Sequence, residues 1–150
     1  MVLVAPSIAA EVHRHSYAVI DGPEHALEVS SAFVTAGLAR CERIMLIGLS
    51  EKRAGSVLNR VREDGADPDG ALRDGQLIIA DQSVTSAVYL MTAKQLTDRI
   101  AGRAAAAVRD GYTGLRVGGL LPGVSISPHE PTLSRLVREH PVTALCLYHR

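Results

Sequence analysis

The sequence predicts an α/β fold of three layers, in which a mostly parallel five-stranded sheet is covered by helices on both faces. Short apolar runs alternate with helical patterns along the whole chain, which is typical of a parallel sheet. Most of these runs lack in–out alternation, because strands that are covered on both faces are apolar throughout. A length of 150 residues suits one domain with a sizeable core. We therefore expect one domain over residues 15–150, preceded by an N-terminal arm or edge strand over residues 1–14.

Five apolar runs are the expected strands. They are "YAVI" (17–20), "RIMLIGL" (43–49), "QLIIA" (76–80), "GLRVGG" (114–119) and "VTALCLY" (142–148). Ligands of parallel α/β sheets bind beyond the carboxyl ends of the strands. Any binding site is therefore expected at the residues that follow these runs.

Helices are expected between the strands. The first covers Glu24–Arg40, where apolar residues recur at helical spacing. Ser50 is the expected N-cap of a second helix, which "DGADPDG" ends with Gly and Pro. Two more helices are expected over Thr92–Asp110 and Pro131–Glu139.

Two connections are longer than the fold needs, Asp81–Met91 and Leu120–Glu130. We expect both to be loops, and long loops after strands often carry function.

Composition and charge exclude several classes of partner. Sixteen basic residues balance sixteen acidic ones, and aromatic content is 3% with no Trp. Direct binding to nucleic acid is therefore not expected. No stretch is long and apolar enough to cross a membrane. The two cysteines, Cys41 and Cys146, do not suggest a disulfide scaffold, so we expect a cytoplasmic protein.

The segment "DGPEHALEVSS" after the first expected strand lacks the features of a phosphate-binding P-loop. That motif uses consecutive backbone N–H groups and a lysine to hold phosphates. Here there is one glycine, a proline without an amide hydrogen, the carboxylates of Asp21 and Glu24, and no lysine. ATP hydrolysis by the usual route is therefore not expected.

The other reactive residues form no complete constellation. His13 and His15 are a possible metal pair, but no third ligand lies nearby in sequence. "HEPTL" at 129–133 lacks the second His of H-E-x-x-H. Cys146, inside an apolar run, is expected to be an unreactive buried thiol. We predict no catalytic residue, no metal site and no cofactor.

Taken together, "HSYAVID", "FVTAGLARCERIMLI", "ALRDGQLIIA", "DGYTGLRVGG" and "HPVTALCLYHR" follow the order and approximate spacing of a known family. The chain resembles the MEDS family, a sensory domain named from methanogen and methylotroph regulators such as the dichloromethane-responsive repressor. The resemblance covers nearly all of 15–148, and "HPVTALCLYHR" is its most specific part. It implies a relative of the RecA/KaiC-like fold that has lost its P-loop.

The resemblance also implies a regulatory input domain, often joined to a DNA-binding, histidine-kinase-like or anti-sigma-factor-like output. This chain has no room for such an output, so we expect it to act in trans or to belong to a longer protein. His15, Asp21 and Arg116 match positions of the family pattern, with no catalytic role attached. Two departures concern the ligand: "GGLL" stands where an acidic residue and Met are common, and His149 stands where Asp is common.

The leading hypothesis is a non-enzymatic sensory domain that binds a small molecule and signals to a regulatory protein partner, such as an anti-sigma factor or a kinase-like protein, in transcriptional control. The candidate ligand contacts are Asp21, Ser50, Asp81, Gln82 and Arg116, with His15 supporting the first strand. Each has an alternative role as a cap, a turn residue or a surface charge.

Two other hypotheses stay open. One is a ligand-free interaction module that acts on such a partner or on a second copy of itself as a homodimer. The small residues at Gly102–Ala107 favour it, although the same residues could pack on the sheet. The other is a divergent nucleotide hydrolase.

Overall fold

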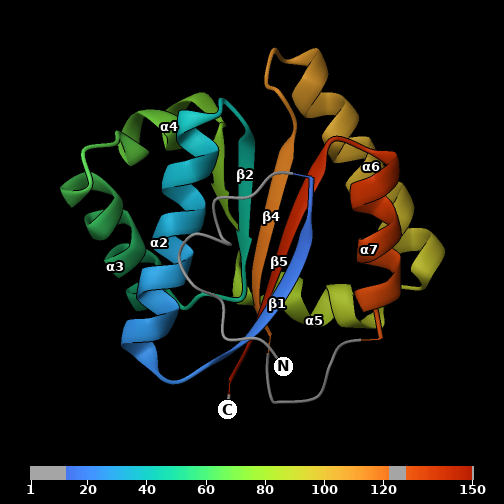
Figure 1. Ribbon diagram of the computed structural model, residues 1–150, viewed down its shortest axis with the longest axis horizontal. Coiled ribbons are helices and arrows are strands. Elements are labelled where there is room, and N and C mark those ends of the chain that lie inside the picture. The colour runs from blue at the N-terminus through green and yellow to red at the C-terminus, as the bar shows by residue number, and fades with distance from the viewer. Residues whose placement is uncertain (1–12, 122–127, 150) are drawn as a thin grey trace.

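The computed structural model describes residues 13–121 and 128–149, which form an α/β fold around one five-stranded sheet (Figure 1). The strands are β1 (His15–Ile20), β2 (Arg43–Ile47), β3 (Leu77–Ile79), β4 (Leu115–Leu121) and β5 (Val142–His149). All are parallel, in the order β1-β5-β4-β2-β3. The predicted fold class and the five predicted strands are confirmed. The N-terminal arm expected over residues 1–14 falls almost entirely outside the described residues.

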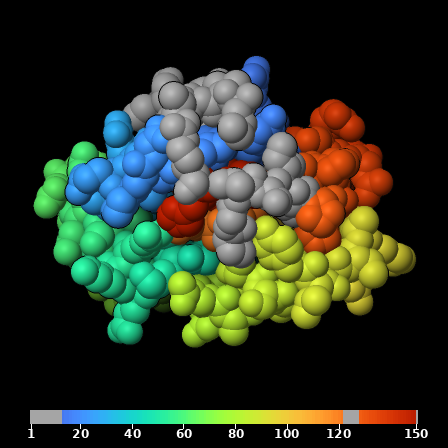
Figure 2. Space-filling view, turned by 90° about the horizontal axis from the view of Figure 1, so that it is seen from below, coloured from blue at the N-terminus to red at the C-terminus, as the bar shows by residue number. Residues whose placement is uncertain are grey.

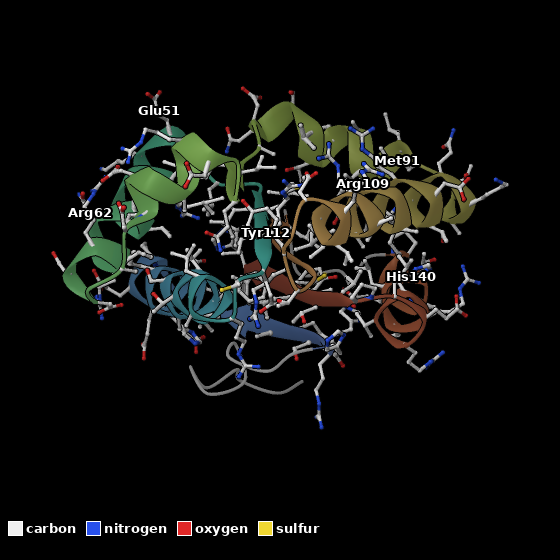
Figure 3. All side chains as sticks on the ribbon, turned by 90° about the horizontal axis from the view of Figure 1, so that it is seen from above. Glu51, Arg62, Met91, Arg109, Tyr112 and His140 are labelled. Atoms are coloured by element: carbon white, nitrogen blue, oxygen red, sulfur yellow. The ribbon has the colours of Figure 1, made fainter. Side chains whose placement is uncertain are left out.

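Helices cover both faces of the sheet. On one face lie α2 (Pro23–Ala39), α3 (Glu51–Glu63) and α4 (Pro68–Asp74), and on the other lie α5 (Gln82–Leu90), α6 (Ala93–Arg109) and α7 (Glu130–Glu139). Figure 3, seen from above, shows the sheet between these two helix layers. Each layer buries its own apolar cluster against the sheet. None of the described helices combines the length and the apolar character that crossing a bilayer requires.

The connections that follow the two neighbouring strands β2 and β4 run toward opposite edges of the sheet. From β2 the chain runs outward to β3 through α3 and α4, whereas from β4 it runs to β5 through α7 on the other face. Because β2 and β4 are neighbours, a topological switch point lies between their carboxyl ends. Open α/β sheets bind ligands at this place.

The loop predicted over Asp81–Met91 is wrong, because α5 occupies most of it. The side chain of Asp81 caps this helix by accepting a hydrogen bond from the Ser83 N–H at 2.8 Å. Its sequence, "QSVTSAVYL", is rich in β-branched and hydroxyl residues of low helix propensity. The cap and packing against the sheet therefore stabilise a helix that propensity disfavours.

The segment predicted only to end α3 also forms a helix. Asp67 caps α4 by accepting a hydrogen bond from the Gly70 N–H at 3.0 Å. Pro68 occupies the first turn, and Gly75 ends the helix in a left-handed conformation with φ 74°. These are ordinary start and stop signals, spaced so closely that they resemble a turn.

The second predicted loop, Leu120–Glu130, overlaps residues 122–127, which lie outside the described residues. On either side of them, β4 continues to Leu121 and α7 begins at Glu130.

Candidate functional site

A groove of about 500 Å³ lies at the topological switch point. It is formed by the carboxyl ends of β2, β4 and β5 together with the first turns of α3 and α5. Figure 2 views the molecule from the side on which these strand ends lie. Most of its lining residues are of polar type, and the lining consists of Gly48, Ser50, Arg53, Gln82, Thr85, Ser86, Leu120, Leu121 and His149.

The groove depends on a close approach of two chain segments. Gly48 follows β2 with φ 85°, and a Cβ atom there would lie 2.1 Å from the carbonyl oxygen of Leu120. Only glycine fits this position, because both the conformation and the space exclude a side chain. The chain then enters α3, whose N-cap Ser50 accepts a hydrogen bond from the Arg53 N–H at 3.2 Å.

The charged group of the groove is the guanidinium of Arg53, on the first turn of α3. It donates to Nε2 of His149, at the end of β5, across 3.1 Å. This contact joins two elements that are 96 residues apart in the sequence. A cation held at a strand-end groove can bind a polar or anionic group.

A second cavity, of about 150 Å³, lies between the sheet and the layer of α5, α6 and α7. Its walls are predominantly apolar and include Ile47, Ala80, Val84, Val88, Ile100 and Leu121. Tyr89 also lines it, and burial, followed by electrostatic interaction with Cys146 and Glu130, raises the pKa of its phenol. An apolar cavity of this size in another protein binds benzene or xenon.

Thr85 and Leu121 line both the groove and the apolar cavity. Thr85 is 9% exposed, and its hydroxyl oxygen has no hydrogen-bond partner among the described residues. Buried polar groups of native proteins are almost always paired. The unpaired hydroxyl is therefore a candidate contact for a bound molecule or water.

A second polar cluster lies between β1, β5 and α7. Nε2 of His15 is 2.5 Å from Oε2 of Glu130 and 3.7 Å from the sulfur of Cys146. The hydroxyl of Tyr148 donates to Oε1 of the same carboxylate. Burial raises the pKa of Glu130, but hydrogen bonds from His15 and Tyr148 and the charge of His15 outweigh burial, so the pKa is below its ordinary value.

The cluster does not have the geometry of an activated thiol. Cys146 and Glu130 both approach the same nitrogen of His15, whereas a nucleophile and an orienting acid would use opposite nitrogens. Burial and then the charge of Glu130 raise the pKa of the Cys146 thiol well above its ordinary value. The cysteine is therefore a neutral thiol at neutral pH.

The structure brings together only part of the predicted contact set. Ser50 and Gln82 line the groove, and Asp81 lies beside it as the cap of α5. A hydrogen bond from the Ser83 backbone is the main reason why the pKa of Asp81 is lowered. Asp21 is exposed at the end of β1, outside the groove lining.

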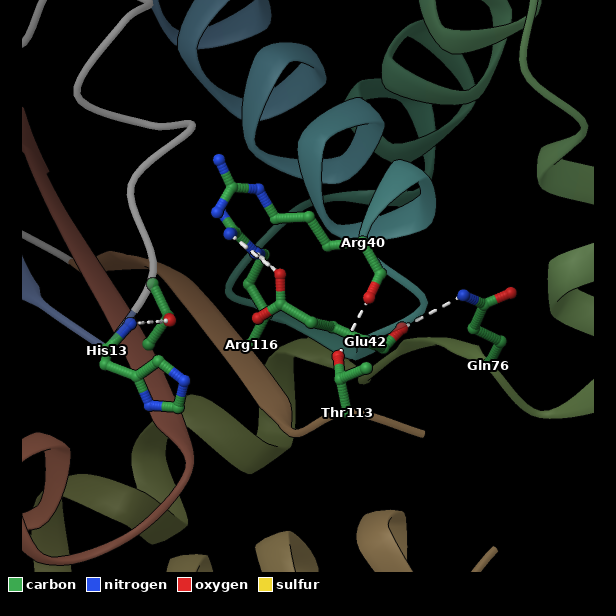
Figure 4. Close-up of polar contacts among 7 residues, drawn as sticks. His13, Arg40, Glu42, Gln76, Thr113 and Arg116 are labelled. Carbon is green, nitrogen blue, oxygen red and sulfur yellow. Dashed lines mark hydrogen bonds and ion pairs between the residues drawn. The ribbon is translucent and has the colours of Figure 1, made fainter. Parts of the chain in front are cut away.

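Arg116 lies on the opposite face from the cavity, with no exposed surface. Its guanidinium donates to Oε1 of Glu42 at 2.9 and 3.0 Å, as Figure 4 shows, and lies 4.8 Å from the centre of the Phe33 ring. Burial lowers the pKa of Arg116, and the ion pair with Glu42 opposes this shift. Its burial and its pairing with Glu42 identify Arg116 as a residue of a core ion pair that does not line the groove.

Sequence reasoning did not select Arg53, Thr85 or His149 as ligand contacts. Arg53 lies three residues after the predicted cap Ser50, so it shares the first turn of the helix at a strand end. The sequence predicts a loop at Thr85, and the helix α5 is what buries this side chain. His149 departs from the family pattern, but nothing in the sequence indicates that it contacts Arg53, 96 residues away.

The groove at the junction of β2 and β4 and the helices on both faces of a parallel sheet define a doubly wound α/β domain. Within that class the chain belongs to the MEDS family. The family model, described as the methanogen/methylotroph, DcmR sensory domain, matches residues 14–150, nearly the whole chain. Membership supports a sensory or regulatory role and confirms the resemblance inferred from the sequence. No curated protein matches the chain.

Proposed function

We propose that this domain is a non-enzymatic sensor that binds one small molecule with an apolar body and a polar head. The body occupies the cavity behind α5 and α6, and the head lies in the groove near Arg53. The observation that carries the proposal is the buried, unpaired hydroxyl of Thr85, which faces both spaces.

The chemistry of the two spaces supports this class of ligand. Small-molecule sites are typically apolar hollows with a few convergent polar groups that fix orientation. The cavity supplies the apolar wall, and Thr85, Gln82 and Arg53 supply polar groups at one end. A guanidinium favours a carboxylate or another anionic head over a cationic one.

The position of α5 supports a signalling role. This helix contributes Thr85 to both spaces and Val88 to the cavity, so a ligand that fills them would contact two successive turns of α5. Its sequence has low helix propensity and its outer end carries Leu90 at 85% exposure. Ligand contacts that stabilise α5 would therefore change a surface that a regulatory protein in transcriptional control can recognise.

The first test is native mass spectrometry of gently purified protein, followed by the same sample after denaturation. A reproducible extra mass that denaturation releases supports the proposal and gives the mass of the natural ligand. The second test titrates hexanoate, hexanol and hexylamine and follows binding by calorimetry. We expect hexanoate to bind best and hexylamine to bind worst.

A matched pair of variants locates the head group. Arg53→Gln removes the cation of the groove, whereas Lys52→Gln removes an exposed cation from the same turn of α3 that does not line it. Because a hydrogen bond to a charged group contributes about 1.5–3 kcal/mol, Arg53→Gln is expected to weaken hexanoate binding roughly tenfold or more. Lys52→Gln is expected to leave binding unchanged. Absence of any bound mass together with no binding of the three probes would overturn the proposal.

The interaction-module hypothesis has support of its own on α6. Ala104 and Ala107 are buried against the sheet, whereas Gly102 and Ala105 are exposed. Ala105→Glu is expected to leave the fold intact. If it also abolishes association in analytical ultracentrifugation, α6 is the surface that contacts a second copy.

A further inference from the structure

We propose that His15, Glu130 and Cys146 form a binding site for a divalent transition metal, with zinc as the best match. The three residues lie on β1, α7 and β5. Their ligand atoms, one from each side chain, all lie within 4.8 Å of one another. This proposal replaces the expectation from sequence that no metal site is present. It does not rest on the small-molecule ligand, although Cys146 also lines the apolar cavity.

The fold points these side chains to one place. Along β5, Ala144, Cys146 and Tyr148 face the layer of α6 and α7, while the alternate residues face the other layer. β1 pairs with β5 in parallel, with His15 opposite Ala144, so its ring lies next to Cys146. Glu130 is the first residue of α7, which packs against β1 and β5.

The ligand types fit zinc. Zinc is bound in proteins by imidazole nitrogen, thiolate sulfur and carboxylate oxygen, at about 2.0–2.3 Å. In a tetrahedral site, nitrogen and sulfur ligands would then lie roughly 3.5 Å apart. The separation between His15 Nε2 and the Cys146 sulfur is 3.7 Å. The Glu130 oxygen is 2.5 Å from the same nitrogen, closer than two zinc ligands would lie, so metal binding requires this carboxylate to move away from the ring.

Contacts around the three ligands match those of metal sites. Nδ1 of His15 is hydrogen-bonded to the Ser134 hydroxyl at 2.8 Å, which leaves Nε2 as the metal-facing nitrogen. Tyr148 donates to Oε1 of Glu130. Such outer contacts orient ligands in metal sites. The other oxygen, Oε2, lies within ion-pair distance of His15 but has no hydrogen bond of good geometry among the described residues.

Charge balance favours a divalent ion in this buried place. The side chains of His15 and Glu130 are 5% and 11% exposed, and Cys146 is 6% exposed. On binding, the Cys146 thiol loses its proton to solvent and becomes a thiolate. A neutral imidazole, a carboxylate, a thiolate and a divalent cation then sum to zero net charge, which avoids leaving a net charge buried. Three protein ligands also leave one position for water, as in open zinc sites.

Cobalt(II) reports this site directly, because tetrahedral cobalt gives visible bands and a thiolate ligand adds a charge-transfer band in the near ultraviolet. We expect the full chain, stripped with a chelator, to bind one Co²⁺ with both features. Zn²⁺ is expected to displace the cobalt and to raise the melting temperature.

The chain offers a matched control in its other cysteine. Cys41 is exposed, follows the end of α2, and is not part of the cluster. Cys41→Ser is expected to keep the charge-transfer band, and Cys146→Ser to abolish it. His15→Gln is expected to weaken cobalt binding about tenfold or more. Loss of the band in Cys41→Ser, or its absence in the unaltered protein, would overturn the proposal.

X-ray absorption on the zinc-loaded unaltered chain keeps the test decisive if a variant fails to fold. One sulfur and two or three nitrogen or oxygen neighbours at the zinc support the site. A shell without sulfur contradicts it.

Discussion

A Cβ atom at position 118 would lie 2.9 Å from the ring of Phe33, whereas one at the neighbouring position 119 would have no atom nearer than 3.9 Å. The two glycines face opposite sides of the same strand, β4. On the α2–α4 side, a void among residues that include Phe33, Leu46 and Leu145 measures about 10 Å³, while the cavity on the α5–α7 side measures about 150 Å³. One face of the sheet is filled, and the other is hollow.

Polar groups follow the same division. On the filled face, Arg116 and Glu42 are buried and satisfy each other. On the hollow face, the Thr85 hydroxyl lacks a hydrogen bond among the described residues, and Oε2 of Glu130 has only its close ion-pair contact with His15. Thr35 of α2 also has an unpaired hydroxyl, but it lines neither the groove nor the apolar cavity. Both faces bury an apolar cluster, but only the α5–α7 face combines a cavity of this size with an unpaired buried hydroxyl among the described residues that line it.

The largest change in stability is expected when the buried ion pair of the filled face is broken. Arg116→Met leaves the Glu42 carboxylate buried without its partner, which should lower the free energy of unfolding by about 3–5 kcal/mol in urea denaturation. Arg62→Met removes an exposed ion pair with Asp69 and should change stability little. Equal losses in the two variants would contradict a structural role specific to Arg116.

The next largest change in stability is expected from substituting Gly118, one of the two neighbouring glycines of β4. Gly118→Ala forces a methyl group against the buried Phe33 ring, and overpacking of this kind costs about 1–3 kcal/mol. Gly119→Ala places its methyl group toward the hollow side and should leave thermal stability nearly unchanged. A larger loss in Gly119→Ala than in Gly118→Ala would show that the two faces have been assigned the wrong way round.

A smaller effect of opposite sign is expected at Thr85. Thr85→Val removes the unpaired hydroxyl while keeping the shape, so stability should rise by about 1 kcal/mol while hexanoate binding weakens. Thr143→Val is the control, because the Thr143 hydroxyl accepts a hydrogen bond from the His13 N–H at 2.6 Å and its loss should destabilise the protein. Destabilisation by both changes would indicate that the Thr85 hydroxyl is paired in solution.

The smallest effect concerns the cap of α5. The hydrogen bond from Ser83 lowers the pKa of Asp81 below its ordinary value of 3.8. The stabilisation from its charge is therefore present above that value and is lost as pH falls through the lower, folded-state pKa. Asp81→Asn retains a capping oxygen without a charge. The stability difference between the two proteins in urea denaturation should shrink from neutral to strongly acidic pH; a constant difference would show that the charge contributes nothing.

The sequence predicted the sheet well, because continuous apolar runs such as "RIMLI" and "VTALCLYH" identify strands that are buried on both faces. It predicted α4 and α5 poorly. The start and stop residues of α4 lie so close together that they resemble a turn, and the residues of α5 have low helix propensity. The rule that ligands bind at strand ends led to Ser50 and Gln82, both of which line the groove.

The rest of the site depends on long-range packing. His15 and Cys146 are 131 residues apart, and Glu130 lies in "HEPTL", which matches no zinc motif. Arg116 appears in sequence as a charge near a strand end, and only the pairing with Glu42, 74 residues away, identifies it as a core residue. Such contacts leave no periodicity in a single sequence.

The most direct test of the contrast between the two faces is NMR of methyl-labelled protein with benzene as a probe. We predict shifts for methyl groups of Val84, Val88 and Ile100, which line the hollow side, and none for Val29, Val57 and Val61, which are buried on the filled side. No shifts, or shifts spread equally over both faces, would contradict a ligand cavity behind α5 and α6.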